Sequence, residues 1–398
     1  MNFAKKIAKD QVMYSGDTLD TEVCAERQHW WDRGLAAAVL DVIILRLGLS
    51  PCIPPVPECL WDFKRKLTFD GNVSATDLDD FPVMVHLDNT NFDFNKAQAN
   101  GEDIRFMDSD TCPTDGTPLK HEIEDWDKPG ANAWVWVKVP RIDGGSIIDF
   151  IYMFYGNGAA PDGQDAVNVW TSGYDGVWHM KGDAGVNVPD SLGVNAGTKL
   201  GVGQPANITE NIDGSQHFDG NNDRIGCGNH ASLDYTTEDI TFSFWINGDS
   251  FPGAGSSREP MPIERYGLQL GGYFVQLDLN VNVRPSMRTY QIGANQNTAS
   301  SLRIAAGTWY YLTFVRSGAD IKIYRNGIEG GYDVKGVHIN PVTRTTIFNL
   351  GYNSWWNANF LDGKLDEVRA AAVARTPDWV MGQYKSQADT LITFGPEE

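Results

Sequence analysis

The feature that most constrains this chain is a strict alternation of apolar and polar residues in short segments. The clearest case is AWVWVKVP at residues 133–140, and LKHEIEDW at residues 119–126 follows the same pattern. A period of two gives a strand one apolar face and one polar face, as in antiparallel sheets that pack on one side. Because such segments follow one another between turns from residue 61 to about 170, this stretch is predicted to form a β-sandwich.

Length and composition extend this prediction to the whole chain. A chain of 398 residues exceeds what one ordinary core supports, which favours two or three domains. The 41 Gly, 13 Trp, 14 Tyr and 18 Phe are typical of β-sandwiches, where glycine serves turns and aromatic rings fill the space between sheets. The net charge of -20 argues against DNA or RNA as a partner, since nucleic-acid binding needs clustered cations.

Residues 1–60 differ from the rest and are predicted to form a partly helical arm. An apolar seam at helical spacing runs through Trp31, Leu35, Ala38, Val42, Leu45 and Leu49, before the linker PCIPPVPEC. The seam is predicted to pack either on the protein's own sandwich or on other copies or a scaffold protein. No secretory signal is expected, because no apolar core follows Lys5, Lys6 and Lys9. No membrane span is expected either, because the apolar run at residues 35–49 is short and carries Asp41 and Arg46.

The five cysteines do not have the spacing of a structural zinc site. They are Cys24, Cys52, Cys59, Cys112 and Cys227. Cys52 and Cys59 flank the proline-rich linker, so a disulfide between them and a pair of reduced thiols are both compatible with the sequence.

The strands of residues 61–172 resemble the domain of unknown function catalogued under the number 2341. The resemblance is carried by WDFKRKLTFDG, HEIEDWD, NAWVWVKVPRIDGG and IYMFYGN, in that order. Members of that family often stand before a laminin-G-like module, so the resemblance implies such a module next. It implies no catalytic role.

Residues 173–398 resemble the laminin-G-like, concanavalin A-like lectin and glucanase superfamily. The matching segments include YDGVWHMKGD, SQHFDGNNDRIGCG, DITFSFWING and FLDGKLDEVR. The chain is therefore expected to be all-β, with two consecutive antiparallel sandwiches, the second a concanavalin A-like jelly roll. Two local features agree with this: YRNG at residues 324–327 suits a type I′ hairpin, and Thr376 before Pro377 suits the start of a closing helix.

No catalytic constellation stands out. Retaining glucanases need two carboxylates about 5 Å apart, and no such pair is evident in the second module. Glu122 and Glu124 share a strand face of the first module, where a solvated face is expected, and the adjacent Asp366 and Glu367 are expected to point to opposite faces. His179 is expected to be a packed or edge residue of the sandwich.

Calcium is the inorganic ligand that the resemblance suggests, since relatives of the second module hold Ca²⁺ at the rim of the jelly roll. Asp219 and Asp223 in FDGNNDR, together with Asp366, are the candidate metal ligands. The alternative is turn chemistry, because Asp in such a turn hydrogen-bonds its own backbone.

Sugar binding needs an exposed aromatic platform beside polar groups, and GYNSWWNANF at residues 351–360 supplies both. Tyr352, Trp355 and Trp356 are therefore the candidate ligand-binding residues. The alternative is that these rings plug the edge of the sandwich or contact the first module.

These observations favour a non-catalytic structural or adhesive protein. We expect a phage virion component, such as a decoration, fibre or tail-associated protein, made in the host cytoplasm and docked through the N-terminal arm as a homo-oligomer or part of a larger assembly. The alternatives are a bacterial cell-surface lectin or adhesin and, less favoured, a glycan-active enzyme. The jelly roll is expected to bind protein or glycan.

Overall fold

The computed structural model describes residues 14–15, 18–19, 59–70, 74–181, 185–251, 259–267, 270–278, 283–352 and 360–398. The chain divides into two compact units, residues 1–60 and 61–398. In the first unit the described residues form an antiparallel pair, β1 (Tyr14–Ser15) and β2 (Thr18–Leu19). The predicted helical seam of the arm lies outside the described residues. Among those described, no helix has the length and apolar character needed to cross a membrane.

The first sandwich consists of two antiparallel sheets that enclose an apolar core, as predicted. In the described residues the strand orders are β26-β3-β8-β5 and β4-β7-β6. Inward-facing valines of β4 and β7, such as Val83, Val85, Val135 and Val137, are completely buried. The strands are β3 (Phe63–Phe69), β4 (Leu78–Asp88), β5 (Arg105–Met107), β6 (His121–Asp127), β7 (Asn132–Ile142), β8 (Phe150–Tyr155) and β26 (Ile392–Glu397), with short helices η1 (Phe94–Lys96) and α4 (Ala166–Val169) between them.

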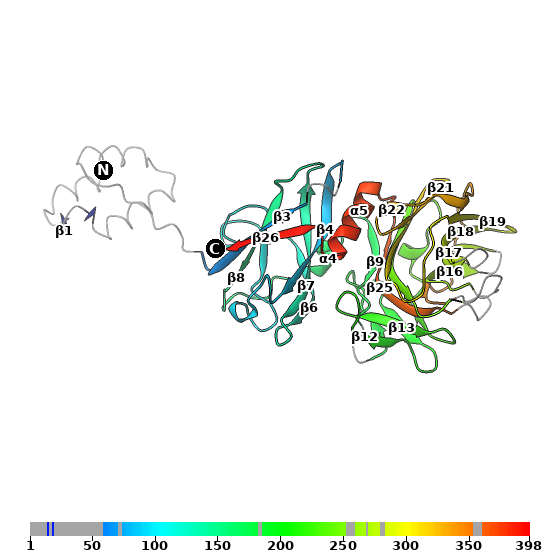
Figure 1. Cartoon of the computed structure of the whole chain (residues 1–398), viewed down its shortest axis with the longest axis horizontal. Coiled ribbons are helices and arrows are strands. Elements are labelled where there is room, and N and C mark those ends of the chain that lie inside the picture. The colour runs from blue at the N-terminus through cyan, green and yellow to red at the C-terminus, as the bar shows by residue number, and fades with distance from the viewer. Residues whose placement is uncertain are drawn as a thin grey trace, which may run out of the picture. The chain divides into compact units, whose positions relative to one another are not determined.

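The last strand of the chain belongs to the first sandwich. β26 pairs with β3 in antiparallel register, and Figure 1 shows the red strand β26 beside the blue strand β3. Before it, helix α5 (Pro377–Gln387) places Trp379 against Phe81, with ring centroids 4.9 Å apart. The sequence prediction assigned residues 173–398 to the second module as a whole. The structure instead returns the final strand to the first sandwich, whose apolar core it helps to cover.

The second sandwich has two antiparallel sheets around its own core. Among the described residues one sheet has nine strands and is called the distal sheet; the other has eight and is called the proximal sheet. The distal sheet contains β10 (Asn187–Val188), β11 (Gly197–Leu200), β14 (Arg224–Gly226), β24 (Asn349–Leu350), β16 (Ile263–Gly267), β17 (Gly271–Asp278), β18 (Arg284–Gln291), β19 (Ala294–Ser300) and β23 (Tyr332–Val334). The proximal sheet contains β12 (Ala206–Ile208), β13 (Ser215–Asp219), β25 (Asp362–Ala371), β15 (Ile240–Gly248), β20 (Tyr310–Ser317), β21 (Asp320–Arg325), β22 (Ile328–Glu329) and β9 (Tyr174–Trp178). The short helix η2 (Ala231–Leu233) follows β14.

Local predictions for the second sandwich are confirmed. Phe242, Phe244 and Ile246 of β15 are completely buried in the core between its sheets. Asn326 and Gly327 have φ values of +52° and +79°, the conformation that a type I′ turn requires between β21 and β22. Thr376 caps α5, because its side chain accepts a hydrogen bond from the Trp379 N–H.

The outward face of the proximal sheet packs on the first sandwich. A shared apolar cluster contains Met84 and Trp136 from the first sandwich and Trp245, Tyr311 and Ala371 from the second. Residues 61–398 therefore form one compact unit in which both sandwiches contribute to the contact.

The structure gives the bonding state of three of the five cysteines. Cys59 and Cys112 take part in disulfide bonds, and Cys227 is a free, buried thiol among the described residues. Cys52 lies outside the described residues, so its pairing with Cys59 stays a prediction.

Candidate functional site

Two β-bulges bring acidic residues to the contact between the sandwiches. In β6 the register with β7 shifts between Ile123 and Asp125, so Glu124 is the extra residue. In β25 the register with β15 also shifts, and Glu367 takes a left-handed conformation with φ of +50°. Bulges re-aim side chains that a regular strand would point elsewhere.

The bulge in β25 changes the predicted direction of two side chains. Leu365 and Val368 both lie in the core of the second sandwich, so the two residues between them share the outward face. Asp366 and Glu367 therefore do not point to opposite faces, as a regular strand would require. The Glu367 N–H donates to Asp366 Oδ1 at 2.8 Å, and both side chains are completely buried.

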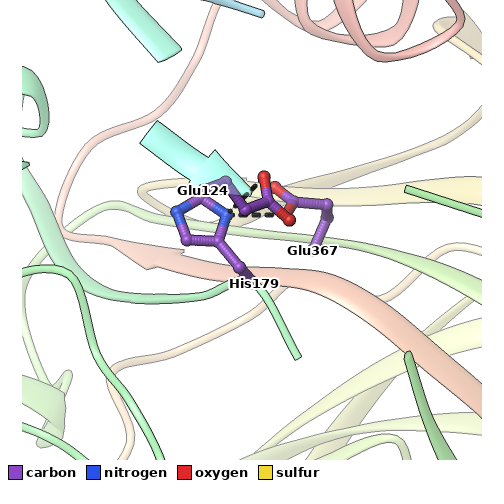
Figure 2. Close-up of side chains that lie close together, drawn as sticks. All are labelled: Glu124, His179 and Glu367. Atoms are coloured by element: carbon purple, nitrogen blue, oxygen red, sulfur yellow. Dashed lines mark hydrogen bonds and ion pairs between the residues drawn. The ribbon is translucent and has the colours of Figure 1, made fainter. Parts of the chain in front are cut away.

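Around these bulges Glu122, Glu124, His179 and Glu367 form a compact group, here called the junction cluster. His179 Nδ1 lies 2.6 Å from Glu367 Oε1 and 3.2 Å from Glu124 Oε2, and its Nε2 lies 3.4 Å from Glu122 Oε2. Figure 2 shows the ring of His179 directed at the carboxylates of Glu124 and Glu367. The side chains of Glu124 and Glu367 are 1% and 0% exposed.

A layer of donors fixes the carboxylates of the junction cluster. Trp136 Nε1 donates to Glu124 Oε2 at 2.7 Å, and Trp170 Nε1 donates to Glu122 Oε2 at 2.6 Å. Ser191 donates to Glu122 Oε1 at 2.7 Å, and Arg369 donates to Glu367 Oε2. The expectation that Glu122 and Glu124 line a solvated face is therefore wrong, because the second sandwich covers that face.

Charge neutrality in the junction cluster depends on its protons. Burial alone would lower the pKa of His179, but the carboxylates of Glu367, Glu124 and Glu122 outweigh it and raise that pKa well above 6.5. Burial and then the neighbouring Glu367 raise the pKa of Glu124 well above its usual value, and the same two causes raise the pKa of Asp366. Glu367 has a lowered pKa, since His179 and Arg369 outweigh its burial.

The junction cluster also has the donor set of a metal site. In the part of the chain that the structure describes, Glu124, His179 and Glu367 are the group whose ligand atoms all lie within 4.8 Å of one another. A histidine nitrogen and two carboxylate oxygens suit a divalent transition metal. Sequence reasoning missed this group because its members come from three distant segments and two of them lie at bulges.

The three predicted calcium ligands do not form one site. Asp219 and Asp223 lie together, since Asp223 Oδ2 accepts the Asp219 N–H at 3.1 Å. Asp219 opposes Asp362 across the sheet, and Asp366 is four residues farther along β25, roughly 13 Å away at 3.3 Å per residue. The oxygens of Asp366 accept hydrogen bonds from Asn211, Ile212 and Glu367.

Asp219 makes the hydrogen bonds of a turn, while Asp223 keeps one carboxylate oxygen without a hydrogen-bond partner among the described residues. Asp219 Oδ1 accepts the backbone N–H groups of Asn221 and Asn222, as the turn interpretation predicts. Asp223 Oδ1 is buried and has no hydrogen-bond partner among the described residues. Calcium at this pair stays a prediction.

The predicted aromatic platform is only partly described. Tyr352 is 4% exposed, and its ring stacks on Phe360 at 4.9 Å and lies beneath the Arg224 guanidinium at 4.6 Å. Phe360 and Arg224 therefore cover the Tyr352 ring, which leaves little of it for stacking on a sugar. Trp355 and Trp356 lie outside the described residues, so their role in ligand binding stays a prediction.

The outward face of the distal sheet carries a row of polar groups that sequence analysis missed. Gln276 opposes Ser286 across β17 and β18, and Arg288 opposes Asn297 across β18 and β19. One atom of each is buried without a hydrogen-bond partner in the described part of the chain: Gln276 Nε2, Ser286 Oγ, Arg288 Nε and Asn297 Oδ1. Because Val275 and Met287 point into the core, these four residues share the opposite face. We call them the distal polar row.

Comparison with known families fits this architecture. Residues 219–381 match the model of the concanavalin A-like lectin/glucanases superfamily. The second sandwich is a concanavalin A-like domain. Residues 100–184 match the domain of unknown function 2341, which therefore precedes the concanavalin A-like domain in the predicted order. No curated protein matches the chain.

Solved structures with similarity to the chain include one domain of an arabinanase and two toxin binding domains. Domain 4 of AbnA, an extracellular GH43 arabinanase from Geobacillus stearothermophilus in complex with arabinotriose, is 18% identical, with a TM-score of 0.41 over 52% of this chain and 97% of that domain. The binding domain of Paraclostridial Mosquitocidal Protein 1 is 17% identical, with a TM-score of 0.43 over 53% of this chain and 52% of its own. The botulinum neurotoxin serotype G binding domain is 12% identical, with a TM-score of 0.43 over 54% and 51%. The chain thus spans about half the length of these two toxin domains.

Proposed function

We propose that this protein is a non-catalytic adhesive protein that binds a glycan on the outward face of the distal sheet. The observation that carries the proposal is the distal polar row, in which four neighbouring side chains each keep an unsatisfied polar atom. Leaving a buried polar group unpaired costs about 1–3 kcal/mol, so such a row is stable only if another molecule or ordered water supplies the partners.

The chemistry of the distal polar row suits a sugar. Gln276 and Arg288 present N–H donors, Asn297 presents an acceptor oxygen, and Ser286 can do either. Sugar hydroxyls also donate and accept, so a glycan can pair with Arg288 and Asn297, the two members of the row that are not fully buried. Aromatic rings lie on the same face, with Phe274 beside Arg288 and next to Tyr290. The row reaches solvent at β19, where Asn295 is exposed.

The non-catalytic part of the proposal rests on the placement of the acids. The junction cluster is the group of carboxylates with a histidine that the described residues bring together, and its side chains are at most 12% exposed. A substrate would have to separate the two sandwiches to reach it. The cluster therefore serves to hold the concanavalin A-like domain on the first sandwich.

The setting that we propose is a phage virion, assembled in the host cytoplasm, with residues 1–60 docking on other virion proteins. The apolar seam from Trp31 to Leu49 supports this role of the arm. A bacterial cell-surface lectin is the alternative. Deleting residues 1–57 should leave residues 61–398 folded and abolish incorporation into particles, whereas unchanged incorporation would refute the arm as the anchor.

Glycan binding is tested with the full chain on a glycan array, followed by calorimetry with the best ligand. Arg288→Ala and Asn297→Ala should each weaken binding about tenfold or more, the effect expected when one or two hydrogen bonds are lost. Arg141→Ala, which removes a surface arginine of the first sandwich, is the matched control and should leave binding unchanged. Equal binding by all of these variants would refute the distal face as the site.

Trp355→Ala and Trp356→Ala extend the same assay to the predicted aromatic platform. Stacking on a tryptophan predicts a loss of about 1 kcal/mol or more when the ring is removed. Binding that depends on the tryptophans and not on Arg288 would move the site to the 351–360 segment.

A further inference from the structure

We propose that Glu124, His179 and Glu367 bind one divalent transition-metal ion, with zinc as the best match, and that this ion joins the two sandwiches. The inference concerns a different face of the second sandwich from the glycan proposal and does not depend on it. It rests on the spacing of the three ligand atoms, on the carboxylate that faces the second ring nitrogen of His179, and on an unpaired carboxylate oxygen.

The spacing of the ligand atoms fits a single ion. Zinc bonds to nitrogen and oxygen of about 2.0–2.2 Å at a tetrahedral angle place neighbouring ligand atoms about 3.4 Å apart. His179 Nδ1 lies 3.2 Å from Glu124 Oε2 and 2.6 Å from Glu367 Oε1, and the three ligand atoms all lie within 4.8 Å. The contact between His179 Nδ1 and Glu367 Oε1, now a hydrogen bond, would have to lengthen by about 0.8 Å for the ion to enter.

The other ring nitrogen of His179 also faces a carboxylate, since Nε2 lies 3.4 Å from Glu122 Oε2. Nδ1 is hydrogen-bonded to Glu367 Oε1 at 2.6 Å; an ion would displace the proton on Nδ1 and bind there, while Nε2–H stays directed at Glu122. A histidine ligand normally donates its second N–H to a carboxylate in this way. Glu122 is itself held by Trp170 and Ser191, so it acts as a positioning residue.

The carboxylates are also oriented as ligands would be. One oxygen of Glu367 accepts from Arg369 while the other faces His179. Glu124 is held by Trp136 through Oε2, and its Oε1 is buried with no hydrogen-bond partner among the described residues. An unpaired Oε1 on a side chain that is 1% exposed is costly, and an ion bound by both oxygens of Glu124 would remove that cost.

A single ion would draw its ligands from both sandwiches, because Glu124 lies in β6, Glu367 lies in β25 and His179 directly follows β9.

The first test is the metal content of the full, tag-free chain produced in zinc-supplemented medium. Plasma mass spectrometry should find about one zinc ion per chain, and removal of the metal with a chelator should lower the melting temperature, which added zinc should restore. Binding of manganese, iron or cobalt in the same ratio would also support the site. A metal-free chain whose melting temperature responds to neither chelator nor zinc would overturn the proposal and leave protons to neutralise the cluster.

Variants then locate the ion. Glu124→Gln and His179→Ala should each reduce bound zinc at least tenfold, and Glu122→Gln should weaken binding about 10–100-fold through His179. His217→Ala is the matched control, because His217 pairs with Asp249 on the surface of the second sandwich and should leave zinc binding unchanged. Retention of one zinc ion by both ligand variants would place the ion elsewhere. Glycan binding is measured on the same metal-free protein: if it persists, the glycan proposal stands whether or not the metal proposal fails.

Discussion

Replacing His338 by glutamine should remove one defined contribution to the acid sensitivity of this protein. His338 is 2% exposed, and its ring nitrogens lie 2.8 Å from Thr289 Oγ1 and 2.9 Å from Thr298 Oγ1. Burial, followed by the positive charges of Arg316 and Lys335, lowers the pKa of His338 from 6.5 to about 4. The folded protein therefore holds the neutral ring in a pH range where the unfolded chain takes up a proton.

The sign and size of the effect follow from that difference. Because the pKa of His338 is lowered in the folded state, its contribution to the free energy of unfolding is fully present above pH 6.5. That contribution is lost as the pH falls toward 4. Lowering the pKa from 6.5 to about 4 corresponds to about 3 kcal/mol in total, of which about 2.5 kcal/mol is lost by pH 4.5. His338→Gln lacks the titrating ring, so its free energy of unfolding should fall less between pH 7.5 and 4.5 by this amount.

Urea denaturation at the two pH values measures the difference, and NMR titration of the His338 ring measures the pKa directly. Thr298→Val is the control, because it removes one hydrogen-bond partner but keeps the ring: it should lower stability at both pH values while the acid sensitivity remains. An NMR midpoint near 6.5 for His338 in the folded protein would refute the reasoning. So would an equal loss of stability in the wild type and His338→Gln.

Three further substitutions test the packing, each by urea denaturation at neutral pH. Trp379→Ala should lower the free energy of unfolding by about 3–5 kcal/mol, since this ring joins α5 to the core of the first sandwich; a loss below about 1 kcal/mol would contradict that role. Gly272→Ala should cost more than about 2 kcal/mol, because Gly272 of β17 has φ of +95° and an added Cβ would lie 2.1 Å from the Arg265 carbonyl oxygen of β16; wild-type stability would contradict this close approach of the two strands. Asp103→Ala should cost about 3 kcal/mol or more, because the buried carboxylate accepts three backbone N–H groups, and a neutral result would mean that water replaces it.

Much of the fold could be predicted because the signals are local. The alternation in residues 133–140 predicted the strand that became β7, and the Asn-Gly pair predicted the turn between β21 and β22. The order of the two sandwiches followed from short motifs that the family models match. In each case a few neighbouring residues determine the conformation, so their pattern can be recognised without the rest of the chain.

The candidate site could not be predicted, because it depends on irregularities and long-range pairing. A period-two pattern assigns Asp366 and Glu367 to opposite faces, whereas a bulge gives them the same one. Glu122 and Glu124 were correctly placed on a common face, yet nothing in their segment indicates that another domain covers it. The distal polar row combines β17, β18 and β19, whose register becomes known only once the strands are paired.

The return of β26 to the first sandwich has a consequence for synthesis on the ribosome. Arg65 of β3 and Gly395 of β26 are 330 residues apart, so at about 5–20 residues per second β26 is made on the order of 20–60 s after β3. During that interval the edge of β3 that β26 will cover is unpaired, and such edges invite pairing with other chains. The concanavalin A-like domain is complete before then and can fold first. A nascent chain therefore carries a finished domain attached to an unfinished one, and this predicts that chaperones bind the first sandwich until its last strand emerges.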